Sequence, residues 1–230
     1  MPAASARQTD TAPNDLVAAR IEQAILDHRL APGTKLTEDE IASIYGVGRT
    51  IVRGALQALT HRGLVEARRN RGAFVAKPSV REAREVLEAR ALLEPRTAHS
   101  AALRAGARDV QILRRHIDDE HAALAEGDTG RAVYLSGEFH VAIARIADQT
   151  TIEQFLSELI ARSSLIVALY WRRPDALCES HAHHALVDAI ADNNADLAEE
   201  IMTSHLVDLG SSLDLSDTPR TTPSLRDALT

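Results

Sequence analysis

Three histidines of this chain are placed in the sequence so that one metal ion can bind all of them. His183 and His205 lie in consecutive segments of helical periodicity and are equally distant from a turn signal at residues 193–194. An antiparallel helix pair that folds at this turn places both imidazoles at about the same height. His140 lies midway along an earlier helical segment. Neutral imidazoles that converge in a helical core suit Zn²⁺, Ni²⁺ or a similar ion. The alternative is that each histidine is an ordinary core or solvated residue.

Arginines recur at helical spacing along residues 48–63, and Gly63 ends this segment. Arg49, Thr50 and Arg53 share its polar side, and the opposite side is apolar. This pattern predicts an amphipathic helix that packs on a core and presents cations outward. Such a helix can contact phosphates and base edges of DNA.

A cationic hairpin is predicted directly after this helix. Two β-prone runs, residues 64–67 and 73–75, are separated by the sequence Arg68-Arg69-Asn70-Arg71-Gly72. A helix with arginines on one face, followed by a basic hairpin, is typical of a winged helix-turn-helix. In that motif the helix enters the major groove, and the wing contacts phosphates or the minor groove. We therefore predict DNA contacts from Arg49, Thr50, Arg53, Arg68, Arg69 and Arg71.

The charge distribution agrees with a single nucleic-acid-binding part. The whole chain has a formal net charge of −7, which by itself argues against nucleic acid. Residues 48–77 instead contain seven Lys/Arg against Glu66 alone, whereas residues 78–230 contain fifteen basic and twenty-five acidic residues. Such asymmetry predicts one part that faces nucleic acid and one that does not. A merely solvated cationic surface is the alternative.

Composition limits the other classes of protein. The 230 residues suffice for two modest domains, and 45% of them are apolar, as is typical of a globular protein. No apolar run approaches the roughly 20 residues of a membrane-spanning helix, and the N-terminus lacks the apolar centre of a signal peptide. The only cysteine, Cys178, excludes an internal disulfide and fits a reducing compartment. We therefore expect a cytoplasmic protein without a membrane partner.

Two further helices are predicted before the arginine-rich one. Residues 1–13 are small and polar and are expected to form a mobile arm, and a first helix covers about residues 14–28. Thr37 followed by Glu40 predicts a capping box at the start of a second helix, residues 38–45. We predict that these two helices bury Leu16, Ile21, Ala24, Ile25, Ile41 and Ile44.

The rest of the chain shows apolar residues at three- and four-residue spacing, with no alternating strand pattern. Turn signals separate the predicted helices, which cover residues 79–104, 107–126, 129–147, 151–171, 178–193 and 195–213. Six such helices predict an antiparallel all-α bundle over residues 78–213. The fold class is therefore mainly α, with a winged helix-turn-helix domain at residues 14–77. Residues 214–230 are rich in Ser, Thr, Pro and Asp and are expected to be disordered.

The residues also resemble a known family. The sequence PGTKLTEDEIASIYGVGRTIVRGALQALTHRGLVEARRNRGAFV, residues 32–75, is similar to the DNA-binding domain of the GntR superfamily. The helical part resembles the ligand-binding FCD domain of the FadR-like branch, on the marks EARALLEP, Phe139-His140, Arg162 and HHALVDAIADNNADLAEEIMTSHL. Together the two resemblances cover about residues 14–210.

The resemblance assigns roles to individual residues. It implies that Arg49 and Arg53 contact DNA and that Gly72 brings the wing tip close to the duplex. It also implies that the three metal-binding histidines of the family correspond to His140, His183 and His205.

This chain departs from the family pattern at a few positions. The family has an aspartate ligand one turn before the first histidine, where this chain has Ser136, and a serine hydroxyl is a poor metal ligand. Glu138 is nearby in sequence but is expected to point to another face than His140. Gly48 replaces the usual serine cap of the recognition helix, and Gly54 replaces an acidic residue, which removes bulk at the expected DNA surface.

These observations predict a ligand-responsive transcriptional regulator, and we favour a repressor. A homodimer would place two recognition helices on a palindromic site of double-stranded DNA. The resemblance implies a small organic acid as effector. An ion on three neutral histidines keeps its positive charge, so the predicted anion site combines this ion with Arg90, Arg162 and Ser136.

Alternatives to these interpretations are open at this point. Arg90 could instead pair with Glu94, four residues later, as a structural ion pair. A metal-dependent hydrolase could use a three-histidine site, although the sequence has no HExxH motif. An architectural DNA-binding protein could use its bundle only for dimerisation.

Overall fold

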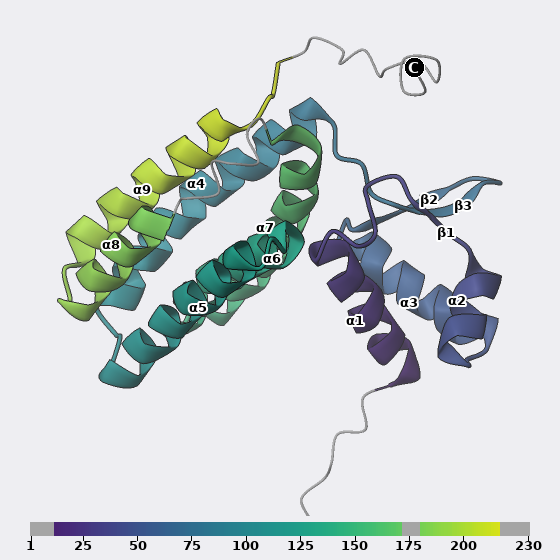
Figure 1. Cartoon of the computed structure of the whole chain (residues 1–230), viewed down its shortest axis with the longest axis horizontal. Helices are drawn as coiled ribbons and strands as arrows, with labels where there is room; N and C mark the ends of the chain where they lie inside the picture. Colours follow the sequence, from purple (N-terminus) through teal and green to yellow (C-terminus); the bar gives the residue numbers. More distant parts are fainter. Residues whose placement is uncertain (1–11, 172–179, 217–230) are drawn as a thin grey trace, which may run out of the picture.

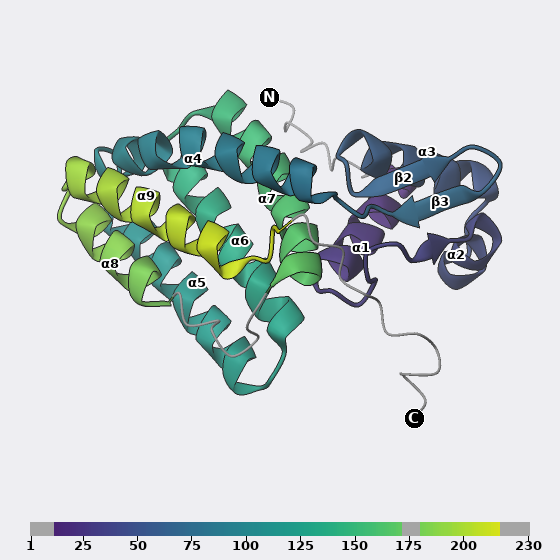
Figure 2. The same ribbon diagram turned by 90° about the horizontal axis from the view of Figure 1, so that it is seen from above.

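The computed structural model describes residues 12–171 and 180–216 of the chain. Most of the expected arm (residues 1–13) and of the expected tail (residues 214–230) lies outside the described residues, as does Cys178. Within the described part, Pro13 does not belong to an arm but is the first residue of the first helix. A small part with helices and a sheet lies against a larger helical part (Figure 1; Figure 2). None of the described helices combines the length and the apolarity that crossing a membrane requires.

The N-terminal part has the element order of a winged helix-turn-helix. Its elements are α1 (Pro13–Leu26), β1 (Lys35–Leu36), α2 (Glu38–Tyr45), α3 (Arg49–His61), β2 (Val65–Arg68) and β3 (Gly72–Val75). β2 and β3 form the antiparallel wing, and β1 pairs with the other edge of β3. The sequence does not reveal β1, because two residues are too few to show an alternating pattern.

The amphipathic pattern predicted for the recognition helix is present in α3. Its apolar side is buried, whereas Arg49, Thr50 and Arg53 are exposed on the other side. Gly46 ends α2 with a φ of 65°, a conformation that glycine adopts most readily, and so permits the tight turn towards α3. Gly72, with a φ of 92°, likewise permits the chain to turn from the wing tip into β3.

Two burial predictions for the N-terminal helices are wrong. Leu16 and Ile44 are 54% and 67% exposed, whereas the other four residues predicted to be buried are in the core. α1 buries Val17 and Ala18 in place of Leu16, because these two are three or four residues before its other buried positions and so share one face with them. α2 has only eight residues, and Ile41 is the one that it buries.

The predicted capping box of α2 is also not formed. Thr37 is the N-cap of α2, but its side chain accepts no hydrogen bond there. A capping box that the sequence did not predict lies at Ser79. The Glu82 amide donates to Ser79 Oγ at 3.2 Å, and the Ser79 amide donates to Glu82 Oε2 at 2.8 Å. This pair fixes the start of the first bundle helix directly after the connection from β3.

The C-terminal part contains the six expected helices: α4 (Val80–Ala102), α5 (Ala107–Ala125), α6 (Thr129–Ile146), α7 (Thr150–Tyr170), α8 (Ser180–Ala191) and α9 (Ala195–Ser212). α4 packs along α9, α5 along α6, and α6 along α7, so the predicted all-α fold is confirmed (Figure 1). Their common core includes Phe139, Ile143, Ile166, Ile190 and Met202. Each such side chain contributes about 1.5–3 kcal/mol when buried, so this core fixes the helices that carry the functional residues.

The two parts are joined by a close contact. Leu165 of α7 belongs to the apolar core of the N-terminal part, and α1 contacts both α6 and α7. His28 follows α1, and its Nε2 atom lies 3.1 Å from both the backbone oxygen and Oγ of Ser164. A Cβ at Gly130 of α6 would lie 2.1 Å from the backbone oxygen of Asp27. The end of α1 therefore approaches α6 so closely that only glycine fits there.

Candidate metal and effector site and DNA-binding face

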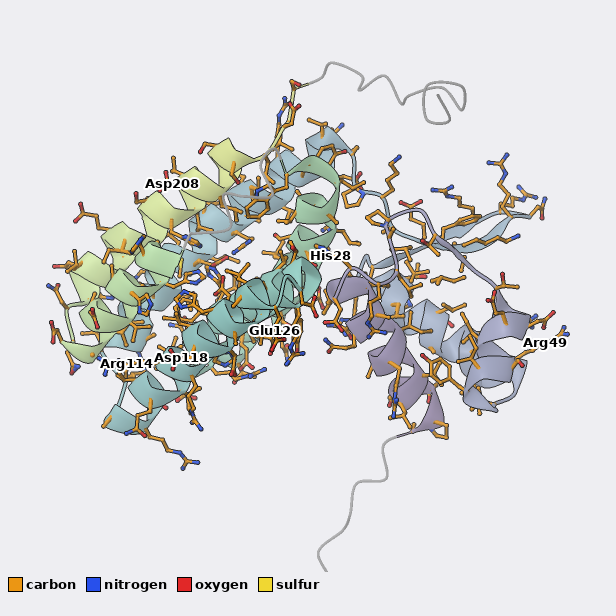
Figure 3. All side chains as sticks on the ribbon, viewed as in Figure 1. His28, Arg49, Arg114, Asp118, Glu126 and Asp208 are labelled. Carbon is orange, nitrogen blue, oxygen red and sulfur yellow. The ribbon has the colours of Figure 1, made fainter. Side chains whose placement is uncertain are left out.

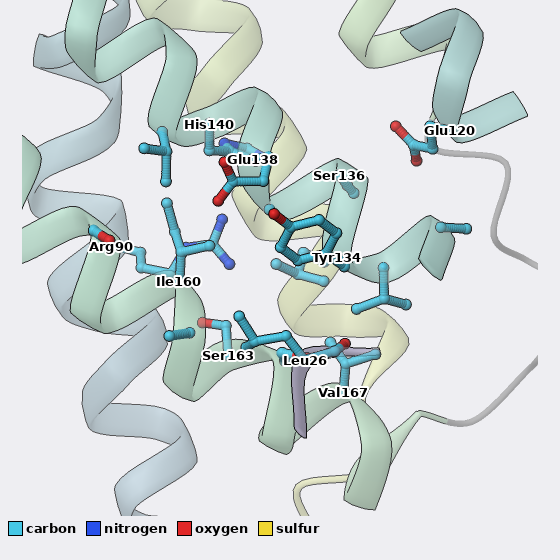
Figure 4. A pocket seen from close by; sticks show the side chains of 18 of the residues that line it. Leu26, Arg90, Glu120, Tyr134, Ser136, Glu138, His140, Ile160, Ser163 and Val167 are labelled. Atoms are coloured by element: carbon cyan, nitrogen blue, oxygen red, sulfur yellow. The ribbon is translucent and has the colours of Figure 1, made fainter. Parts of the chain in front are cut away.

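A cavity lies among the bundle helices and reaches the end of α1 (Figure 4). Residues of α4, α5, α6, α7 and α9 make most of its wall. Arg90 and Glu138 lie beside His140, whereas the apolar side chains of Leu26 and Val167 lie on the opposite side in this view. The cavity therefore has polar groups beside His140 and apolar side chains across from them in this view.

Three buried histidines from three helices converge beside this cavity. His140 of α6, His183 of α8 and His205 of α9 are 4%, 0% and 2% exposed. One ring nitrogen of each lies within 4.8 Å of the others, and the Nε2 atoms of His140 and His205 are 3.2 Å apart. The ring centres of His183 and His205 are 4.9 Å apart, because the α8–α9 hairpin turns midway between them.

Two buried carboxylates that the sequence did not predict orient these histidines. His140 Nδ1 lies 2.5 Å from Glu94 Oε2, and His183 Nδ1 lies 3.2 Å from Glu120 Oε2. A carboxylate at Nδ1 holds the ring proton there and leaves the Nε2 lone pair for another ligand. The second oxygen of Glu94 accepts a hydrogen bond from Arg90 Nε at 2.5 Å.

The electrostatic environment favours the charged form of Glu94 and the neutral forms of His140 and His205. Burial by itself would raise the pKa of Glu94, but Arg90 and His140 outweigh this effect and hold the pKa well below its usual range. Burial lowers the pKa of His140 against the opposing charge of Glu94. Burial, together with His140 and His183, also lowers the pKa of His205 well below its usual value. Neutral imidazole is the form that binds a metal ion.

These residues fit a divalent ion. Zn²⁺ bound at about 2.0–2.1 Å in a tetrahedral site separates its ligand nitrogens by about 3.4 Å, which is close to the 3.2 Å between the Nε2 atoms of His140 and His205. His183 Nε2 is buried and has no hydrogen-bond partner among the described residues, as expected of an atom that is directed at an ion. A bound ion would supply positive charge and open coordination positions for an anionic ligand.

Two of the three residues expected to bind the effector line the cavity. Arg90 and Ser136 do so, and Arg90 at the same time forms its alternative ion pair within α4. Arg162 does not line this cavity. It packs over the turn between α3 and β2, where a Cβ at Gly63 would lie 3.3 Å from the Arg162 Cδ. Glu138 lines the cavity together with His140, contrary to the expectation from helical spacing.

The predicted DNA-binding residues of α3 are accessible. Arg49 lies at the end of the molecule that is remote from the bundle (Figure 3). Arg49 Nε is 2.5 Å from Asp39 Oδ1, and Arg53 Nε is 2.7 Å from Glu38 Oε2, so both arginines pair with the first turn of α2. Exposed ion pairs of this kind are weak, and an approaching phosphate can replace the carboxylate.

The wing arginines differ in their surroundings. Arg68 pairs with Glu66 at 3.0 Å, and its guanidinium carbon lies 4.6 Å from the centre of the Phe74 ring, so it is held against the sheet. Arg69 and Arg71 are exposed at the wing tip and form no ion pair with the described residues. The tip therefore presents two unpaired cations to a DNA backbone.

A winged helix-turn-helix joined to a helical domain with an internal cavity is the architecture of a DNA-binding regulator with a ligand-binding domain. Residues 13–75 match the gntR family of bacterial regulatory proteins, and residues 85–208 match the FCD domain. The chain therefore belongs to the gntR family and carries an FCD domain. It is a DNA-binding transcriptional regulator, and the alternative of a metal-dependent hydrolase is set aside.

Several known proteins are similar to this chain over most of its length. The chain is 31% identical to the Uxu operon transcriptional regulator of Escherichia coli (strain K12), over 84% of each chain. It is 27% identical to the HTH-type transcriptional repressor RspR of the same strain, over 80% of this chain and 81% of that protein. The solved structure of E. coli McbR/YncC superimposes with a TM-score of 0.78 at 17% identity, covering 87% of this chain and 96% of that one. The last similarity concerns the fold alone.

Proposed function

We propose that this regulator is a repressor that leaves its operator when a small organic acid binds in the bundle cavity. The observation that carries the proposal is the buried cluster of His140, His183 and His205 beside a cavity that also contains Arg90. Arg90 and an ion bound to the neutral histidines would supply positive charge within this enclosed space, which favours an anionic ligand. The similarity to the repressor RspR supports the direction of regulation.

A divalent ion, Zn²⁺ or Ni²⁺, would be bound by the three histidines. Its charge would attract the carboxylate of the effector, and Arg90 and Ser136 would donate hydrogen bonds to the same group. Ser136 occupies the position of an expected aspartate ligand, so one coordination position would remain for the effector. Glu94 and Glu120 would hold two of the imidazoles in place.

DNA recognition would use α3 and the wing. The contacts to base edges and phosphates would come from Arg49, Thr50, Arg53, Arg68, Arg69, Arg71 and Gly72. A homodimer would place two α3 helices in successive major grooves of a palindromic operator. As a transcriptional regulator, the protein would work in the cytoplasm. The DNA-binding parts would have two placements relative to the bundles. The effector would bind one of them more tightly and would therefore shift the population towards it.

Elemental analysis combined with DNA binding tests this proposal. Duplexes that the purified protein selects from a random pool serve as operator probes. His183→Ala should lose most of the bound metal and the response of DNA binding to organic acids. His181→Ala, at an exposed position of the same helix, is the matched control and should keep both. Equal metal content in the two variants would reject the metal site, and operator binding that no organic acid changes would reject effector control.

A further inference from the structure

The DNA-binding part contributes one wall of the bundle cavity. Glu22 and Leu26 of α1 line it, and so does Arg62. Arg62 directly follows the last residue of α3 and is the C-cap of that helix. Figure 4 shows Leu26 across the cavity from His140. The cavity thus extends from the histidine cluster to the end of the recognition helix.

Arg62 uses only some of its hydrogen-bond donors on its protein partner. Its Nη1 atom donates a hydrogen bond to Glu22, and the two side chains are 35% and 16% exposed. A guanidinium group has five N–H donors in a planar fork, and the other donors of Arg62 have no partner among the described residues. A carboxylate that enters the cavity can therefore bind this fork and compete with Glu22.

The carboxylate of Glu22 is in an unfavourable position for holding its charge. Burial raises its pKa even though Arg62 opposes this effect, and Glu138, which lines the same cavity, raises it further. The charged form of Glu22 is therefore disfavoured by its surroundings, and Arg62 is the charge that opposes this effect. A ligand that is already held near the histidines can present a second carboxylate to Arg62 from inside the same cavity.

We propose that Arg62 is a second anion-binding residue of the effector site, and that the effector is a dicarboxylic acid whose far carboxylate binds Arg62 in competition with Glu22. This inference rests on the proposed function, because the first carboxylate is taken to bind near His140 and Arg90. It links the ligand to DNA directly, since α3 carries Arg49 and Arg53 in its first turns and has Arg62 as its C-cap. A ligand that spans the cavity fixes one placement of this helix relative to the bundle.

The test compares straight-chain diacids, from malonate to adipate, with monocarboxylic acids of equal chain length. Their dissociation constants for the full chain are measured by calorimetry with one equivalent of Zn²⁺. At least one diacid should bind wild type about tenfold or more tightly than its matched monoacid, as expected for hydrogen bonds to a charged group. Arg62→Gln should abolish this preference, whereas Glu22→Gln should increase it, because the competing charge is removed.

The opposite signs of the two variants separate ligand contact from structural damage. If the Glu22–Arg62 pair mattered only for folding, both variants would weaken diacid binding alike, and Arg62 would be rejected. Arg81→Gln and Glu85→Gln, which break an exposed pair on α4, are matched controls and should bind like wild type. Monoacid binding without a diacid preference would overturn the role of Arg62 alone. Failure of both acid classes to bind would overturn the proposed function and this inference with it.

Discussion

Glu94 of α4 lies 2.5 Å from His140 of α6, with its Oε2 atom at the Nδ1 atom of the ring. Its other carboxylate oxygen accepts a hydrogen bond from Arg90, so one buried carboxylate joins an arginine of the cavity wall to a candidate metal ligand. A charged oxygen beside Nδ1 favours the His140 tautomer that has its proton on this atom. The same carboxylate also places Arg90, the proposed anion-binding arginine, next to the histidine cluster.

Removal of the Glu94 charge should therefore weaken metal binding without removing a ligand. Glu94→Gln should lower Zn²⁺ affinity by about 10–100-fold, the usual effect of losing a partner of a metal-binding histidine. A competition titration with a chelator measures this affinity, and thermal unfolding checks that the variant is folded. Glu85→Gln, at an exposed position of the same helix, should bind Zn²⁺ like wild type. Equal affinity of the two variants would show that Glu94 does not support the site.

Ser136 offers a test in the opposite direction. It lies one turn before His140 on α6 and lines the cavity. Ser136→Asp should tighten Zn²⁺ binding by more than about tenfold. Losing a residue that only supports a metal ligand already weakens binding by about tenfold or more, and a new direct ligand should contribute more than that. Ser136→Asn has nearly the same shape without the charge and should have a much smaller effect. A chelator competition in which both variants match wild type would contradict a metal ion at this position.

Much of the fold could be predicted because its elements follow from local patterns in the sequence. The six bundle helices follow from the three- and four-residue spacing of apolar residues, and the wing follows from two β-prone runs around a basic turn. The meeting of His183 and His205 follows from their equal distance to one hairpin turn. These features depend on local sequence, so they are visible without the tertiary structure.

The remaining parts of the site depend on how helices rotate against one another. Glu94 was visible only as a partner of Arg90 four residues away, whereas its contact with His140 requires α4 and α6 to face each other. Glu120 reaches His183 across a sequence separation of 63 residues, for which no local pattern exists. The contribution of Arg62 to the cavity likewise depends on how the two parts are joined.

The ion pair between Glu38 and Arg53 leads to a prediction about DNA affinity. Glu38→Gln should bind operator DNA a fewfold more tightly, since Arg53 then binds a phosphate without first breaking an ion pair. Exposed ion pairs are worth up to about 1 kcal/mol. Glu40→Gln is the matched control, because Glu40 is in the same turn but forms no ion pair with the described residues. Fluorescence anisotropy at several salt concentrations measures both. If the two variants gain equally, the gain reflects net charge and not release of Arg53.

His28 should make stability depend on pH. Burial lowers its pKa below the ordinary 6.5, so the unfolded chain binds more protons than the folded one as the pH falls. The stability present at pH 7 is therefore lost progressively below about pH 6.5. His28→Asn, which tolerates the φ of 57° at this position, should lose less stability between pH 7 and pH 5 in urea unfolding. His61→Asn, at an exposed position, should follow wild type.

Gly54 within α3 should be a site where stability can be gained without loss of DNA binding. The expectation that Gly54 removes bulk at the DNA surface is not met, because a Cβ there would point to α1 and lie 3.5 Å from the Asn14 Cβ, an ordinary contact. Gly54→Ala should raise the free energy of unfolding by about 1 kcal/mol, the helix propensity difference, with unchanged operator affinity. Gly130→Ala is the contrasting control, since its Cβ would lie 2.1 Å from the Asp27 backbone oxygen and force α1 away from α6. Chemical unfolding of both variants decides the matter: a loss of stability in Gly54→Ala would mean that α1 packs more tightly on α3 than this contact implies.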